Sequence, residues 1–179
     1  GGIANRYAFT NTSSIIVNNT PEDRAPISPD GSAFVYVNSS SSSSYNNASL
    51  SDGYFGYCIN SHRGATGKGN PLTVASMSEV TNSVNGRPVG EYIKILFYNY
   101  YESVNQNRIW ILTDENFFKS NDPIIKKVIE DYNSGLRIPD HGAKKRVNKT
   151  SYRYYDFESL LSTNVANQNL FGYKVRHYY

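Results

Sequence analysis

Cys58 is the residue of this sequence whose side chain is best suited to covalent chemistry. It is the only cysteine among 179 residues, so the chain cannot form an internal disulfide. A lone cysteine in a globular domain is most often a small buried hydrophobe. Here it lies in an aromatic and apolar run at residues 54–59, and a glycine-rich stretch follows at residues 62–70. The run predicts a packed segment and the stretch a loop that gives access to the sulfur, so we interpret Cys58 as a reactive centre.

Gln106 and Gln168 are the second chemical feature of the sequence. They are its only two glutamines, whereas the chain has 21 asparagines. A residue type this rare is expected to persist where its shape is needed. The two glutamines are therefore candidate site residues together with the cysteine.

Three short motifs carry these residues, and the only tryptophan lies in the second motif. They are Tyr57-Cys58-Ile59, then Asn105-Gln106-Asn107-Arg108-Ile109-Trp110 followed by Leu112-Thr113-Asp114, and finally Asn167-Gln168-Asn169-Leu170. In this order, over residues 57–170, they resemble the thioester domains found at the tips of Gram-positive surface adhesins. The sequence departs from the family pattern at four positions, because Thr is usual at Asn105, Ala at Arg108, and apolar residues at Asn167 and Asn169.

The resemblance implies a bond between Cys58 and a glutamine. In such domains the cysteine sulfur displaces ammonia from a glutamine side chain, which leaves an internal thioester that a lysine amine of another protein attacks. The resemblance makes Gln168 the cross-linked residue and Gln106 a neighbour whose amide hydrogen-bonds near the bond, although the chemistry alone permits either glutamine. It implies no cofactor and no metal. A water-excluding apolar shell is expected from Tyr54, Phe55, Tyr57, Trp110 and Phe171.

Two other functions fit some of the same residues. Cys58 can be the nucleophile of a hydrolase or transferase, with His141 or His177 as base and an Asn or Asp to orient it, but this leaves the glutamines unexplained. The chain can also be a binding or stalk domain with an inert cysteine and an internal amide cross-link between Lys and Asn. His62 is a candidate for proton transfer, although a loop histidine near a cysteine is more often incidental. Residues 64–69 lack the first Gly and the last Ser/Thr of a phosphate-binding loop.

Composition limits the location and the partners of the protein. The net charge of +3 is spread along the chain, which argues against nucleic acid, and we interpret Lys144, Lys145, Arg146 and Lys149 as a solvated face. No apolar run approaches the roughly 18 residues that span a bilayer. A cysteine-poor chain rich in Asn and Tyr is typical of a Gram-positive surface protein. We therefore expect an extracellular, wall-anchored, monomeric domain that captures a host surface or matrix protein through a lysine, once and not as an enzyme.

The order of the expected elements predicts an α+β fold. Short β-like runs at residues 7–10, 14–17 and 33–37 precede a Ser/Asn-rich loop at residues 38–51. Helices are expected at residues 89–101, 105–112 and 122–133, and strands at residues 153–157 and 170–178. We expect one domain over residues 1–179, with N-terminal strands and loop at 1–53 and the thioester-bearing core at 54–179. Strands from both ends would form a β-sandwich or barrel-like sheet, with a helical lobe inserted between them.

Overall fold

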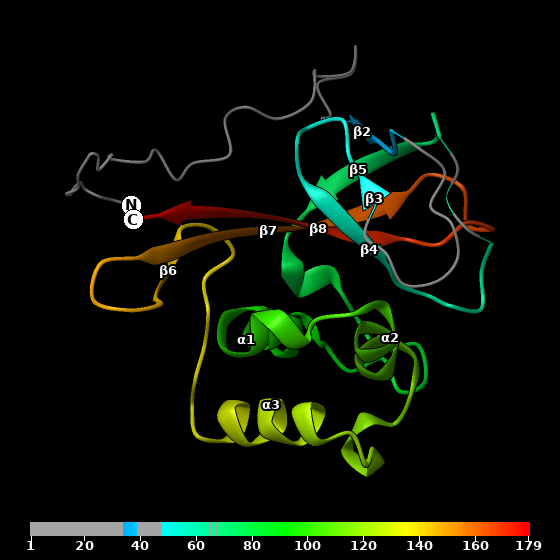
Figure 1. Ribbon diagram of the computed structural model, residues 1–179. Helices are drawn as coiled ribbons and strands as arrows, with labels where there is room; N and C mark the ends of the chain where they lie inside the picture. Colours follow the sequence, from blue (N-terminus) through cyan, green and yellow to red (C-terminus); the bar gives the residue numbers. More distant parts are fainter. Residues whose placement is uncertain (1–33, 39–47, 65, 67) are drawn as a thin grey trace.

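An antiparallel sheet forms the body of the computed structural model (Figure 1), which describes residues 34–38, 48–64, 66 and 68–179. In these residues the sheet has seven strands in the order β2-β5-β7-β8-β4-β3, and β6 pairs with the first residues of β7. The strands are β2 (Phe34–Tyr36), β3 (Ala48–Ser49), β4 (Phe55–Cys58), β5 (Pro71–Ala75), β6 (Ala143–Arg146), β7 (Tyr152–Ser162) and β8 (Leu170–Tyr178). The strands expected at residues 7–10 and 14–17 lie outside the described residues.

The sheet curls into a half-barrel, and its outer strands β2 and β3 meet. Val37 and Leu50 form an antiparallel bridge, and the backbone N–H of Ser51 donates to the carbonyl of Tyr36 at 2.8 Å. One buried cluster takes a side chain from each strand of this curl: Val35, Ala48, Cys58, Leu72, Leu160 and Leu170. The sheet thus encloses Cys58 in a small apolar core.

Three α-helices lie together on one side of the sheet (Figure 1). They are α1 (Gly90–Tyr100), α2 (Gln106–Asp114) and α3 (Pro123–Asn133), with the 3₁₀ turns η1 (Met77–Glu79), η2 (Tyr101–Ser103) and η3 (Phe117–Lys119). The ring of Phe97 in α1 has its centroid 4.6 Å from that of Tyr173 and 5.6 Å from those of Phe157 and Phe171. This aromatic core holds the helices against the face of β7 and β8 opposite to the Cys58 cluster, because side chains alternate between the two faces of a strand.

The α+β class expected from the sequence is confirmed. The expected helices and β8 are present, β7 is longer than expected, and β5 and β6 were not predicted. Residues 48–49 are also strand, where the sequence predicted loop, because Ala48 and Leu50 point alternately into the Cys58 cluster. No helix in the described ranges combines the length and the apolar character that a bilayer crossing requires.

Asp140 ties α1 to the segment that leads into β6. Its carboxylate lies 2.7 Å from Nζ of Lys94, whose side chain is only 4% exposed. It also accepts hydrogen bonds from the N–H of Met77 at 3.1 Å and the hydroxyl of Ser76 at 3.2 Å. Burial acts to raise the pKa of Asp140, but the hydrogen bonds from Lys94 and Met77 and the attraction of the ammonium outweigh it. The pKa therefore lies below its ordinary value of 3.8.

Asp140→Asn is expected to lower the free energy of unfolding at neutral pH by about 2 kcal/mol, because it leaves the buried Lys94 ammonium with Glu91 alone, at 3.1 Å. The folded pKa of Asp140 is below the unfolded one, so its contribution is lost as the pH falls through the folded value. The difference between wild type and variant should therefore shrink below about pH 4. Urea unfolding at neutral and acid pH measures this difference. Glu79→Gln, which removes an exposed carboxylate of η1, is the control, and equal losses in the two variants would contradict the role of Asp140.

Candidate functional site

Cys58 ends β4 opposite Leu170, the first residue of β8. The next residue, Ile59, donates its backbone N–H to the carbonyl of Asn169 at 2.9 Å. Hydrogen-bonded and non-hydrogen-bonded pairs alternate along an antiparallel ladder, so Cys58 and Leu170 form a non-hydrogen-bonded pair. The N–H and C=O of Cys58 therefore point away from β8.

Gln106 occupies the place that a further strand would take beside Cys58. Its Oε1 accepts the N–H of Cys58 at 3.0 Å, and its Nε2 donates to the carbonyl of Cys58 at 2.7 Å. A carboxamide presents an acceptor and a donor side by side, so it matches one backbone residue of a strand edge. Gln106 is 3% exposed and is the first residue of α2. These contacts give a structural reason for a glutamine at position 106.

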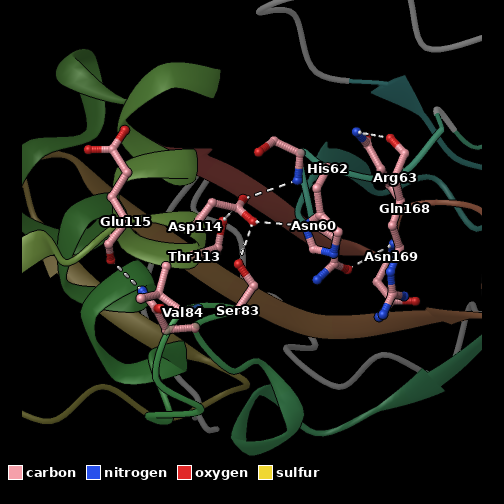
Figure 2. Close-up of polar contacts among 12 residues, drawn as sticks. Asn60, His62, Arg63, Ser83, Val84, Thr113, Asp114, Glu115, Gln168 and Asn169 are labelled. Atoms are coloured by element: carbon pink, nitrogen blue, oxygen red, sulfur yellow. Dashed lines mark hydrogen bonds and ion pairs between the residues drawn. The ribbon is translucent and has the colours of Figure 1, made fainter.

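A turn after Cys58 brings Gln168 to the same end of β4. Asn60 has a φ of 64°, a left-handed conformation that asparagine tolerates, and it reverses the chain. The carbonyl of Arg63 then accepts Nε2 of Gln168 at 2.9 Å, and the carbonyl of Gly64 accepts its backbone N–H at 2.7 Å. Figure 2 shows Gln168 beside Arg63. The carboxamide of Gln168 is held against the turn.

The β4–β8 register places Gln168 diagonally from Cys58. Gln168 comes two residues before Leu170, and diagonal neighbours on one face of an antiparallel pair lie within reach of long side chains. Gln168 is 7% exposed and Cys58 is 8% exposed. The hydroxyl of Thr66 also donates to the backbone carbonyl of Gln168. Cys58 and Gln168 are therefore both buried at the end of the sheet where β4 ends and β8 begins.

Trp110 lies one helical turn after Gln106 and on the same face of α2. It packs against the buried cluster that contains Cys58. Its indole N–H is buried and meets no acceptor within the described part of the chain. A buried donor without a partner costs free energy and calls for an explanation, and a reactive site is one place where such donors are found.

The apolar shell around Cys58 differs from the one expected. Tyr54 belongs to the Cys58 cluster and Trp110 packs on it, but Tyr57 and Phe171 belong to the core beneath the helices. Phe55 is 46% exposed. The expectation was wrong for these three residues because it ignored alternation along β4 and β8, which turns residues 55, 57 and 171 away from the face of Cys58 and Leu170. The remaining shell comes from other strands: Val35, Leu50, Leu72, Leu160 and Leu170.

Asp114 connects the turn after Cys58 to the end of α2 (Figure 2). It accepts the backbone N–H of Ser61 at 3.2 Å and the hydroxyls of Ser83 and Thr113, each at 2.8 Å. Nδ1 of His62 lies 3.7 Å from the carboxylate, and the His62 side chain is 58% exposed whereas that of Asp114 is 8% exposed. The sequence analysis assigned Asp114 no role. The available signal was its position at the end of the motif Leu112-Thr113-Asp114, which follows Trp110.

Three of the four departures from the thioester-domain pattern, at Asn105, Arg108 and Asn169, have local reasons. Asn105 caps α2 by accepting the N–H of Arg108 at 2.8 Å, and Asn and Thr are both good capping residues. Arg108 pairs with Asp122, the cap of α3, at 3.0 Å, so it joins the starts of two helices. The side chain of Asn169 accepts the N–H of Ser162 at 2.8 Å and closes the connection between β7 and β8.

His141 and His177 lie far from Cys58. His177 is seven residues beyond Leu170 on β8, which corresponds to about 24 Å along the strand. His141 lies 3.8 Å from Asp156, which pairs with Lys174, about 13 Å from Leu170 along β8. The structure therefore does not bring Cys58 together with either base that a hydrolase would need. Among the residues that the structure describes, no group of three or more His, Cys, Asp or Glu is placed to hold a metal ion.

Comparison with protein-family models, curated proteins and solved structures finds no match to this chain. Function is therefore inferred from the residues of the site. They bring one cysteine and two glutamines to one end of a buried sheet, and these are the residue types from which an internal thioester can form.

Proposed function

We propose that this chain is a covalent adhesin domain in which Cys58 and Gln168 form an internal thioester that an amine of a partner protein opens. The observation that carries the proposal is the convergence of the only cysteine and the only two glutamines at the end of β4. Gln106 bonds both backbone groups of Cys58, at 3.0 and 2.7 Å, and Gln168 bonds the turn that follows Cys58 at 2.9 Å. The fold does not require that the only cysteine and the only two glutamines of the sequence lie together.

Thioester formation begins with attack of the Cys58 sulfur on the side-chain carbonyl carbon of Gln168. A C–S bond forms, the C–N bond breaks, and the thiol proton leaves with the amide nitrogen as ammonia. Gln106 fixes the backbone from which the sulfur approaches, and the turn at Arg63 fixes the departing nitrogen. Negative charge develops on the carbonyl oxygen of Gln168 during the attack. We assign to the unpartnered indole N–H of Trp110 the role of donating a hydrogen bond to this oxygen.

Capture of the partner reverses the roles of these groups. A lysine amine attacks the thioester carbonyl, a C–N bond forms, the C–S bond breaks, and Cys58 leaves as thiolate, which is a good leaving group because the ordinary pKa of a cysteine thiol is only about 8.5. The ammonium group of a lysine must first lose a proton. We assign to His62, which is exposed next to Asp114, the role of the base that accepts it. The partner ends joined to Gln168 by an amide, and the apolar cluster keeps water from competing.

The proposal extends to the setting of the domain. It places the protein outside a Gram-positive cell, anchored to the wall, as a monomer whose partner is a host surface or matrix protein. It also includes the finer description of the fold, in which the curled sheet is the barrel-like body and the helices between β5 and β6 are an inserted lobe.

Intact-mass spectrometry before and after methylamine treatment tests the thioester. The wild-type protein is expected to be lighter than its sequence by one ammonia, and its thiol is expected to resist alkylation until methylamine has opened the bond. Cys58→Ala and Gln168→Ala should each have the full sequence mass. A wild-type protein of full mass, with a thiol that is alkylated at once, would contradict the proposal. A deficit that survives both methylamine and Cys58→Ala would indicate an internal amide cross-link instead.

Tandem mass spectrometry of the opened protein assigns the partner of Cys58. Methylamine leaves an N-methyl amide on whichever glutamine carried the sulfur, and we expect it on Gln168. The same modification on Gln106 would reverse the roles of the two glutamines.

A further inference from the structure

The β6–β7 hairpin carries positive charge that no carboxylate of the described residues fully neutralises. Residues 143–155 contain five Lys or Arg and no Asp or Glu, which exceeds the net charge of +3 of the whole chain. Arg153 pairs with Glu102 at 3.2 Å. The other four, Lys144, Lys145, Arg146 and Lys149, form no ion pair with any carboxylate of the described residues. Neighbouring like charges are unfavourable in a folded protein, so this cluster calls for an explanation.

Tyrosine rings hold three of these four cations in place. Nζ of Lys144 and Cζ of Arg146 lie over the ring of Tyr152, at 4.2 and 4.8 Å from its centroid. Nζ of Lys145 lies 4.8 Å from the centroid of Tyr98 in the same way. Cation–π contacts order long side chains, so less conformational entropy is lost when these cations bind a ligand. The hairpin thus presents preorganised positive groups, with Lys144 and Arg146 on one face and Lys145 on the other, against α1.

A pocket of about 290 Å³ lies at the same hairpin. Its lining includes Tyr101, Asn148, Ser151, Tyr152 and His177, together with Arg153 and Glu102, which form an ion pair. Phenol, amide, hydroxyl and imidazole groups donate and accept hydrogen bonds, which suits a small ligand with many hydroxyl groups.

We infer that the β6–β7 hairpin and its pocket bind a sulfated polysaccharide. The cations suit the sulfate groups, and the pocket suits one hydroxylated sugar ring of the chain. Nucleic acid is disfavoured, because binding of single strands depends on bases that stack on aromatic rings, and the cations Lys144, Arg146 and Lys145 cover Tyr152 and Tyr98. The sequence alone led us to interpret these four cations as a solvated face. The inference assigns that face a ligand instead.

This surface is remote from Cys58. Tyr152 pairs with Tyr178, eight residues along β8 from Leu170, so the two sites are about 27 Å apart along the strand. In Figure 1, β6 and β4 lie toward opposite ends of the long strands β7 and β8. The inference does not rest on the thioester, and Cys58→Ala should bind polysaccharide as the wild type does.

Heparin binding as a function of NaCl concentration tests the inference. The hairpin variant Lys144→Gln/Lys149→Gln is compared with Lys126→Gln/Lys127→Gln, which removes the same charge from exposed positions of α3. The hairpin variant is expected to bind heparin about tenfold more weakly, with the slope of log K against log[NaCl] reduced by about 2. The α3 variant should stay within about twofold of wild type. Equal losses in the two variants would overturn the inference, because they would mean that only overall charge matters.

Two further measurements address the pocket and the class of ligand. His177→Gln, measured at a pH where histidine is neutral, is expected to weaken heparin binding and leave the salt slope unchanged. Unchanged affinity would overturn the assignment of the pocket. A DNA duplex that displaces heparin as well as unlabelled heparin does, at matched charge concentration, would overturn the assignment to a polysaccharide.

Discussion

Gln106→Ala is expected to slow formation of the thioester by about a hundredfold and to lower the free energy of unfolding by about 2–4 kcal/mol. The loss of stability arises because Gln106 bonds the N–H and C=O of Cys58 that point away from β8, and water reaches little of this buried site. The loss of rate arises because the sulfur must approach one carbon of Gln168, and a displacement of about 1 Å at the end of β4 is sufficient to prevent a productive approach.

The rate is measured by refolding the protein from denaturant and following the loss of ammonia by intact mass. Asn107→Ala, at the next and exposed residue of α2, is the matched control and should form the thioester at the wild-type rate. Gln106→Glu keeps the acceptor for the N–H of Cys58 but replaces the donor to its carbonyl, so it should be nearly as slow as Gln106→Ala. Wild-type rates in both Gln106 variants would show that this side chain does not position the sulfur.

The elements that the sequence predicted are those with local signals. Asp122 and Pro123 mark the start of α3, and the structure has Asp122 accepting the N–H groups of Ile124 and Ile125 at 2.9 and 3.0 Å. Asn105 marks the start of α2 in the same way. By contrast, the strand residues of β6 are one alanine and three cations, and nothing in that run predicts a strand. Its conformation follows from pairing with β7, a partner that sequence patterns do not identify.

The candidate site was predictable as a set of residues and not as a set of contacts. Rarity marked Cys58, Gln106 and Gln168, because a side chain needed for its shape stands out against a biased composition. The contact of Gln106 with the backbone of Cys58 depends on how α2 packs against the end of β4, and no local pattern encodes that packing. The role of Asp114 likewise depends on residues from three separate segments meeting at one carboxylate.

Gly90→Ala is expected to destabilise the protein by about 3 kcal/mol or more. Gly90 begins α1, and a β-carbon there would lie 2.2 Å from the carbonyl oxygen of Met77 and 2.9 Å from its carbonyl carbon. The backbone cannot readily move aside, because the N–H of Val80 bonds that same oxygen at 3.1 Å and Asp140 holds the N–H of Met77. The start of α1 must therefore shift, together with the aromatic core that Phe97 forms with the sheet.

Urea unfolding of Gly90→Ala and of Gly64→Ala separates this close approach from a general effect of replacing glycine. At Gly64 a β-carbon would lie 3.6 Å from the nearest atom, the carbonyl oxygen of Ala166, which is an ordinary contact. Gly64→Ala should therefore change the free energy of unfolding by less than about 1 kcal/mol, in either direction. Similar stabilities for the two variants would mean that η1 and α1 can separate at little cost. A loss confined to Gly90→Ala would show that the helical layer is fixed to the sheet at this point, independently of the chemistry at Cys58.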